Sequence, residues 1–255
     1  MTLWEAAAVF AAGLGAGTIN TVVGSGTLIT FPVLLAVGLP PITANVSNTL
    51  GLVPGSISGA IGYRRELRGQ RRRILRFGAA AMTGGLIGAI LLLALPSNAF
   101  DTIVPALIAI ALVLVIAQPR LATALRARRE RQGTTAHRDG GIALLTGLLF
   151  ASMYGGYFGA AQGVLYLSLM GLLLNEDLQR INGLKNVLAL VVNGIAAVFF
   201  LFVADFNWTA VLLIAVGSSL GGQIGATVGR RLPPTALRAV IVVVGLAAIA
   251  QLLLK

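Results

Sequence analysis

Residues 84–99, GGLIGAILLLALPSNA, return 137 positions later as residues 221–236, GGQIGATVGRRLPPTA. Eight of the sixteen positions are identical, and the two copies align without a gap. Both copies are rich in glycine and in apolar residues, and glycine is more frequent in membrane helices than in soluble ones. The repeat therefore predicts a membrane chain made of two related halves.

Apolar stretches cover most of the 255 residues, of which only 11% are charged, against about 25% in a soluble domain. Eight stretches approach the roughly 20 residues that a spanning helix needs: 5–23, 42–62, 77–96, 101–119, 141–160, 181–204, 207–229 and 234–254. Two more, 27–38 and 163–174, are shorter. Only helices and closed barrels satisfy the backbone in lipid, and these runs are too long for barrel strands. The sequence predicts an all-α polytopic membrane protein.

The net charge of +11 would suggest nucleic acid if the basic residues were scattered. Sixteen of the nineteen basic residues instead fall in three loops, 63–76, 119–140 and 229–238. Two loops between these, around residues 96–101 and 204–207, hold only acidic charges, Asp101 and Asp205. The positive-inside rule then places the three basic loops in the cytoplasm of a cell inner (plasma) membrane and both chain termini outside. The charge is a topology signal, and we expect no nucleic-acid partner.

Charge and repeat together predict that the two halves are inverted. The loop after the first copy is acidic and external, whereas the loop after the second copy is basic and cytoplasmic. We expect a first membrane repeat at 1–118, a cytoplasmic linker at 119–140 and a second repeat at 141–255, with about five hydrophobic segments in each repeat. Inverted repeats are typical of transporters whose substrate binds near the midplane, at the repeat interface.

The two short segments occupy equivalent places in the two halves, and each follows a glycine-containing break. Such paired, broken segments indicate a transporter's binding site, because a helix that starts inside the membrane directs unpaired N–H groups and a positive dipole end at an anion. The candidate substrate-binding residues at the breaks are Gly24, Ser25, Gly26, Thr27, Gly159, Gln162 and Gly163. The alternative is a tightly packed, kinked helix that uses glycine for close approach.

Further candidates lie just before the breaks. Asn20 and Thr21 end the first span, and Tyr154 lies in the matching part of the second half. An asparagine in an apolar helix is costly unless it is paired, so Asn20 either coordinates a ligand or forms an interhelical hydrogen bond. For Thr21 a hydrogen bond to its own helix backbone is the favoured interpretation.

Amides and one lysine follow the short segments. Asn182 and Asn186 share a helix face with Lys185 between them, and a shift of 138 aligns Asn48 with Asn186. We expect Asn48 and Asn186 to line one cavity from opposite halves, whereas Asn45, which follows two prolines, is interpreted as a helix N-cap. Lys185 is the only lysine before the C-terminal residue. It is expected to pair with an anion, to carry a coupling proton, or to snorkel to the interface.

In order and pairing, these motifs resemble those of the TauE/SafE family of membrane permeases. In the first half they are Gly13-Leu-Gly-Ala-Gly17, Gly24-Ser-Gly26 with Pro32, Asn45-Val-Ser-Asn48 and Gly59-Ala-Ile-Gly-Tyr-Arg-Arg65. In the second half they are Tyr154-Gly-Gly-Tyr-Phe-Gly159, Asn182-Gly-Leu-Lys-Asn186 and Gly221-Gly-Gln-Ile-Gly-Ala226. The resemblance covers nearly the whole chain outside 119–140. It implies a role in moving sulfite, sulfonates or other small organic or sulfur-containing anions.

The expected function is therefore secondary transport of a small anion, coupled to a proton or sodium gradient, with the lipid bilayer as surroundings. The alternatives are a passive anion channel and a non-transporting membrane scaffold subunit. No catalytic residue set and no cofactor motif is recognised, and a chain with no cysteine and one histidine, His137, predicts no metal site. Direction of transport and oligomeric state stay open, with a homodimer among the alternatives.

Overall fold

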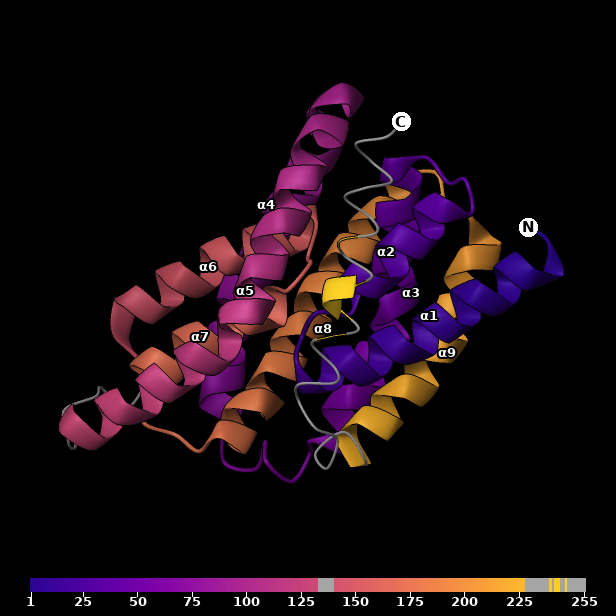
Figure 1. Cartoon of the computed structure of the whole chain (residues 1–255). Coiled ribbons are helices and arrows are strands. Elements are labelled where there is room, and N and C mark those ends of the chain that lie inside the picture. Colours follow the sequence, from indigo (N-terminus) through magenta and orange to yellow (C-terminus); the bar gives the residue numbers. More distant parts are fainter. Residues whose placement is uncertain (133–139, 228–238, 240, 244–245, 247–255) are drawn as a thin grey trace.

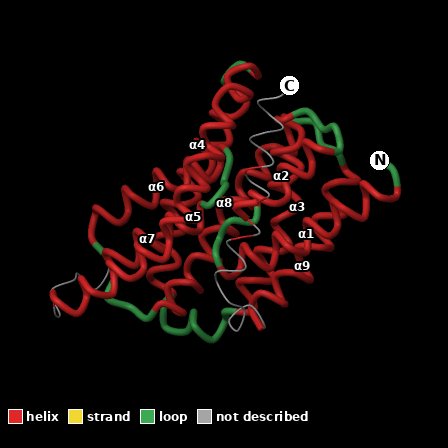
Figure 2. Tube along the Cα trace, in the orientation of Figure 1, coloured by secondary structure: helices red, strands yellow, loops and turns green. Residues whose placement is uncertain are grey.

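The computed structural model describes residues 1–132, 140–227, 239, 241–243 and 246. Within these residues the chain is all-helical and contains no strand (Figure 2). The helices are α1 (Leu3–Val22), α2 (Thr27–Ala36), α3 (Pro41–Gly62), α4 (Arg71–Ala94), α5 (Ser97–Gln132), α6 (Gly141–Tyr157), α7 (Gln162–Leu173), α8 (Leu178–Val203) and α9 (Trp208–Thr227). The basic loop 229–238, His137 and most of the predicted span 234–254 lie outside the described residues.

The helices begin where local chemistry favours a start. Thr2 and Glu5 form a capping box at the start of α1, and the Asp177 side chain accepts a hydrogen bond from the Gln179 N–H at the start of α8. Helix α3 begins at Pro41, a residue type suited to the first helical position because its missing N–H has no intrahelical partner there. The interpretation of Asn45 as an N-cap is therefore wrong, since Asn45 lies inside the helix.

Helices α2 and α7 confirm the two short segments predicted from the sequence. They contain 10 and 12 residues. At 1.5 Å per residue they reach about 15 and 18 Å, well short of the roughly 30 Å hydrocarbon core. Each follows a sharp reversal in which a glycine, Gly24 or Gly159, has a positive φ angle of 88° or 78°.

Helix α5 is much longer than the predicted span 101–119. Its 36 residues extend over about 54 Å, and its C-terminal end projects at the lower left of Figure 1. The helix continues through residue 132, so the first part of the predicted linker 119–140 is helical, and residues 133–139 lie outside the described part of the chain.

Helices of the N-terminal half pack against helices of the C-terminal half. Helix α9 packs against α1 and α3, and α4 packs in the same way against α6 and α8, as the two sides of Figure 1 show. The glycines of the sequence repeat lie at these contacts, where a Cβ would overlap the facing helix: Gly84 and Gly88 on α6, Gly85 on α8, Gly221 and Gly225 on α1, and Gly222 on α3. Each glycine and its counterpart 137 residues later thus face equivalent helices, which is the packing expected of a duplicated chain.

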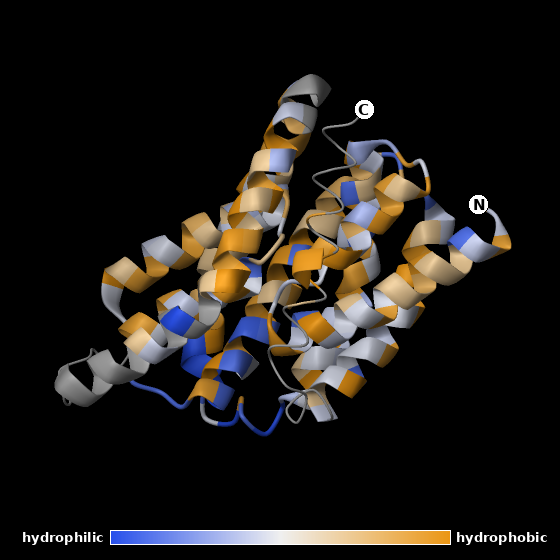
Figure 3. Ribbon diagram, in the orientation of Figure 1, coloured by the Kyte–Doolittle hydropathy of each residue, from blue (hydrophilic) through white to orange (hydrophobic). Residues whose placement is uncertain are grey.

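The outer surface is apolar, as a bilayer requires. Helices α4, α8 and α9 are long and apolar enough to cross a membrane, and shorter apolar helices lie between them. Large apolar side chains such as Phe150, Phe202 and Leu212 are exposed on the outside. Hydrophilic residues concentrate at the start of α4 and in the nearby loops (Figure 3).

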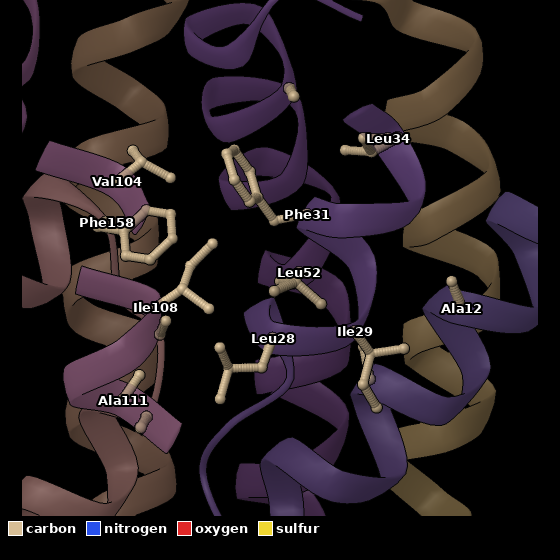
Figure 4. Packing of buried hydrophobic residues seen from close by; sticks show 14 of the residues in the cluster. Ala12, Leu28, Ile29, Phe31, Leu34, Leu52, Val104, Ile108, Ala111 and Phe158 are labelled. Atoms are coloured by element: carbon tan, nitrogen blue, oxygen red, sulfur yellow. The ribbon is translucent and has the colours of Figure 1, made fainter. Parts of the chain in front are cut away.

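One apolar cluster joins elements from both ends of the chain. Phe31 of α2 meets Phe158, which follows α6, edge to face with ring centroids 5.1 Å apart (Figure 4). Leu28, Leu52 and Ile108 belong to the same buried cluster, which anchors the two breaks in a packed interior.

Candidate functional site

The two glycine breaks meet in the interior. The Gly163 N–H donates a hydrogen bond of 3.0 Å to the Gly24 carbonyl oxygen. A Cβ on either residue would overlap the backbone of the other, and the positive φ of Gly24 also favours glycine there. The close approach by glycine that the sequence offered as the alternative to a binding site is present at this contact, and the role of the breaks in binding stays a prediction.

The C-terminal end of α1 is capped by side chains of α8. Carbonyls in the last turn of a helix lack an intrahelical donor. The Lys185 ammonium donates to the carbonyl oxygens of Asn20 at 2.7 Å and Thr21 at 3.0 Å. The amides of Asn182 and Asn186 also donate to the Thr21 oxygen, each at 3.3 Å. Five of the predicted site residues are therefore brought together here: Asn20, Thr21, Asn182, Lys185 and Asn186.

Lys185 is buried without a negative partner. It is fully buried and is the one charged side chain among the described residues that is buried. No acidic side chain of the described residues forms an ion pair with it. Its stem passes the second break, because a Cβ on Gly163 would lie 3.0 Å from Lys185 Cδ. A buried cation bonded only to neutral carbonyls is suited to accept an anion.

The Thr21 hydroxyl donates to the Gly17 carbonyl at 2.9 Å, which confirms the interpretation of that side chain as a bond to its own helix. Thr21 contributes its backbone carbonyl oxygen to this cluster. Because every residue has such an oxygen, the residue type could not have indicated this role. In the same cluster, the Asn182 Oδ1 is buried and has no hydrogen-bond partner among the residues that the structure describes.

Neutral donors remain unused beside this cluster. The Ser25 hydroxyl is buried and has no hydrogen-bond partner, and the N–H groups of Ser25 and Gly26 bond to no described residue. The half-buried Asn20 side chain likewise forms no hydrogen bond with the described residues, and it lies against Gly26. The first break thus leaves hydrogen-bond donors free next to the lysine.

Asn48 belongs to a different hydrogen-bonded group. Its amide donates to the Thr27 hydroxyl at 3.3 Å, and its oxygen accepts from the Thr30 hydroxyl, so that α3 is tied to the start of α2. Asn48 and Asn186 share no hydrogen-bond partner in the described structure, and their common cavity stays a prediction. Sequence analysis missed Thr30, although its position one turn after Thr27 on a short helix could have indicated it.

A third polar group lies at the second break. The Gln162 amide donates to the Tyr166 hydroxyl at 2.6 Å, and that hydroxyl lies 2.6 Å from the Ser152 hydroxyl. The Tyr154 hydroxyl donates to the Ala160 carbonyl at 2.6 Å, which fixes the break itself. Sequence analysis missed Ser152 and Tyr166 because each is an isolated polar residue within an apolar stretch.

Asn45 and Asn182 make corresponding contacts across the two halves. The Asn45 amide donates to the Tyr157 carbonyl at the end of α6, as the Asn182 amide does to Thr21 at the end of α1. These two residues are 137 positions apart, as are the starts of α3 and α8. In this register Lys185 corresponds to Asn48, whereas the alignment of Asn48 with Asn186, at a shift of 138, stays a prediction.

The starts of α4 and α8 are joined by ion pairs. Glu176 accepts from Arg73 at 2.5 Å and from Arg180 at 2.9 Å, and the Gln70 amide donates to the Arg180 carbonyl. Partial burial acts to raise the pKa of Glu176, but the Arg73 hydrogen bond, the Asp177 N–H and the charges of Arg180 and Arg73 outweigh it, so the pKa lies below its ordinary value. Arg180, the member of this group on α8, lies five residues before Lys185, about one and a half helical turns away.

A family model described as "Sulfite exporter TauE/SafE" matches residues 9–252. The chain belongs to the TauE/SafE family. It is similar to a probable membrane transporter protein of Haemophilus influenzae, with 26% identity over 93% of this chain and 90% of that protein. It is also similar to the probable membrane transporter protein YfcA of Escherichia coli K12, with 27% identity over 93% and 86% of the two chains. A third relative, the probable membrane transporter protein ORF9 of Sinorhizobium sp., is 26% identical over 96% and 91%. No solved structure matches.

Membership in the TauE/SafE family, the relatives' names and the apolar helices agree on one broad function. The protein is a multi-pass membrane transporter, with a small-molecule substrate and a bilayer around it. The names are those of transporters rather than enzymes.

Proposed function

We propose that this TauE/SafE chain is a secondary transporter that moves a small organic or sulfur-containing anion, such as sulfite or a sulfonate. The observation that carries the proposal is the fully buried Lys185, whose hydrogen bonds go to two carbonyl oxygens and whose surroundings contain no acidic partner among the described residues. A buried charge is costly unless it is paired, and a bound anion supplies that pair.

The surrounding donors support an anion rather than a cation as substrate. An ammonium group has three donors, and the two carbonyls use two of them. The free N–H groups and the hydroxyl of Ser25 lie at the start of α2, where the helix dipole favours negative charge. The proposed substrate-binding residues are those expected from the sequence, with Lys185, Asn20 and Ser25 closest to the anion.

We further propose alternating access between two inverted repeats, 1–118 and 141–255, whose helices pack in two mixed groups: α9 with α1 and α3, and α4 with α6 and α8. Lys185 belongs to α8 of the second half, whereas the carbonyls that it holds belong to α1 of the first half. Helix α1 belongs to one packed group and α8 to the other, so relative movement of the two groups would change this contact directly. In the proposed orientation the ion pairs around Glu176 lie on the cytoplasmic side, with the basic loop 63–76.

The same contact bears on the coupling ion. Carbonyl oxygens at the ends of broken helices are common ligands for a coupling sodium ion in transporters. Here the Lys185 ammonium already holds the carbonyls of Asn20 and Thr21. We therefore favour a proton over sodium as the coupling ion.

Counterflow in proteoliposomes tests this function. Vesicles containing the purified chain are loaded with unlabelled methanesulfonate, and uptake of external radiolabelled methanesulfonate and sulfite is followed. Saturable uptake that depends on internal anion supports a secondary transporter. Uptake that does not saturate and ignores internal anion indicates a channel, and no uptake of any small anion contradicts the proposal and favours a scaffold role.

A further inference from the structure

We infer that the site beside Lys185 is selective for anions that carry one negative charge, such as sulfonates, monocarboxylates and the protonated form of sulfite, hydrogensulfite, and rejects anions with two charges, such as sulfate and the sulfite dianion. This inference rests on the proposed function and names the substrate class more narrowly. It follows from the number of charges that the described interior contains.

Lys185 supplies a single positive charge to the interior. Every other buried side chain with a polar group among the described residues is a neutral serine, threonine, asparagine, glutamine or tyrosine. The residues that contact the lysine, Asn20 and Thr21, offer carbonyl oxygens, which are electron-rich and add no positive charge. One monovalent anion beside the lysine therefore makes the site neutral.

The nearest arginines do not add to this charge. Arg180 lies five residues before Lys185 on α8, and its side chain is one-third exposed. Its donors are engaged by Glu176 and by the Arg68 carbonyl. Arg73 pairs with the same carboxylate. The charges of Arg73, Arg180 and Glu176 therefore pair with one another at the starts of α4 and α8, away from the buried lysine.

The remaining donors can orient an oxyanion without changing the charge balance. The buried Ser25 hydroxyl has no hydrogen-bond partner, and the Asn20 amide forms no hydrogen bond with the described residues. Gly24 contacts Gly163, which contacts the lysine stem, so the break and the lysine are adjacent. Neutral donors can bind the oxygens of a sulfonate or a sulfate equally, and only the charge separates the two.

A second negative charge would stay unpaired in the interior. Leaving a buried charge without a partner is strongly unfavourable, whereas a charge paired by hydrogen bonds and an opposite charge is tolerated. We expect a dianion of the same shape to bind at least about a hundredfold more weakly than the monoanion.

Methanesulfonate and sulfate are a matched pair of probes, because both are tetrahedral and a methyl group replaces one oxygen. Calorimetric titration of the purified full chain with each probe gives the two affinities directly. The inference predicts measurable methanesulfonate binding and sulfate binding that is at least about a hundredfold weaker. Sulfate affinity within about tenfold of methanesulfonate affinity overturns it.

Two further arms separate this inference from the function on which it rests. Lys185→Arg keeps the charge and should retain the preference for methanesulfonate, whereas Lys185→Gln should abolish the preference along with most of the binding. If both probes bind equally and counterflow persists, the charge rule fails and the transporter proposal stands. If neither probe binds and no small anion shows counterflow, the proposed function itself fails. The wild-type comparison is decisive even where a variant does not fold.

Discussion

The Lys185 ammonium of α8 lies 3.0 Å from the Thr21 carbonyl oxygen at the end of α1, so a side chain from the C-terminal half caps a helix of the N-terminal half. A cation at a helix C-terminus is favoured by the helix dipole. The same lysine is the only buried charge of the described residues, so it is both a helix cap and the candidate anion ligand.

This contact predicts transport that does not depend on sodium. The carbonyls of Asn20 and Thr21 are already bonded to an ammonium group, which leaves no vacant cation site between them. Replacing external sodium by choline should change the initial rate of methanesulfonate uptake by less than about twofold, since no coordinated sodium is lost. An imposed pH gradient serves as the comparison, and sodium-driven accumulation would contradict the prediction.

The meeting of the two breaks predicts that Gly24 cannot be replaced. Gly24→Ala combines a positive φ angle with overlap of the Gly163 backbone. Gly38 is a matched control, because its φ is also positive, at 86°, but nothing lies near a Cβ there. We expect Gly38→Ala to cost about 1–2 kcal/mol of stability, and Gly24→Ala to cost about 2 kcal/mol more.

Thermal unfolding of the two variants in detergent checks this difference. Equal losses of stability would show that the Gly24–Gly163 contact contributes little beyond the backbone angle.

The ion pairs of Glu176 predict a pH-dependent contribution to stability. Its pKa is lowered in the folded protein, so its stabilising effect is present above the unfolded value of about 4.3 and is lost as pH falls through the lower, folded value. Glu176→Gln should therefore reduce stability by about 1 kcal/mol near neutral pH, through loss of the bonds to Arg73 and Arg180.

The unfolding temperatures of wild type and Glu176→Gln, measured from neutral pH downward, test the sign. The two should converge in acid, below the folded pKa. A difference that stays constant across this range would assign the effect to packing rather than to the carboxylate charge.

Much of the fold follows from apolar patterning and glycine. Runs of apolar residues predicted the helices, and the short segments became α2 and α7 within a few residues. Composition also pointed to Lys185 as the single interior cation. Asn45 could have been assigned correctly, since Pro41 at the first helical position places it a turn inside α3.

The contacts of the site could not be predicted in the same way. Thr21 acts through its backbone oxygen, which any residue would offer, and the contact between Gly24 and Gly163 joins segments far apart in the chain. The Tyr166 network likewise depends on how α6 and α7 pack. Such juxtapositions arise from tertiary packing, whereas periodicity reports only which face of a helix is buried.

Methanesulfonate counterflow with Lys185→Gln decides whether Lys185 binds the transported anion. Asn193→Ala is the matched control, because Asn193 is a half-buried polar residue further along α8 whose side chain bonds, within the described part of the chain, to Ser56. With equal amounts of folded protein in the vesicles, the account predicts at least about a hundredfold slower counterflow for Lys185→Gln, because a buried charge pair is lost, and near wild-type counterflow for Asn193→Ala. Counterflow by Lys185→Gln at the rate of the control would contradict it.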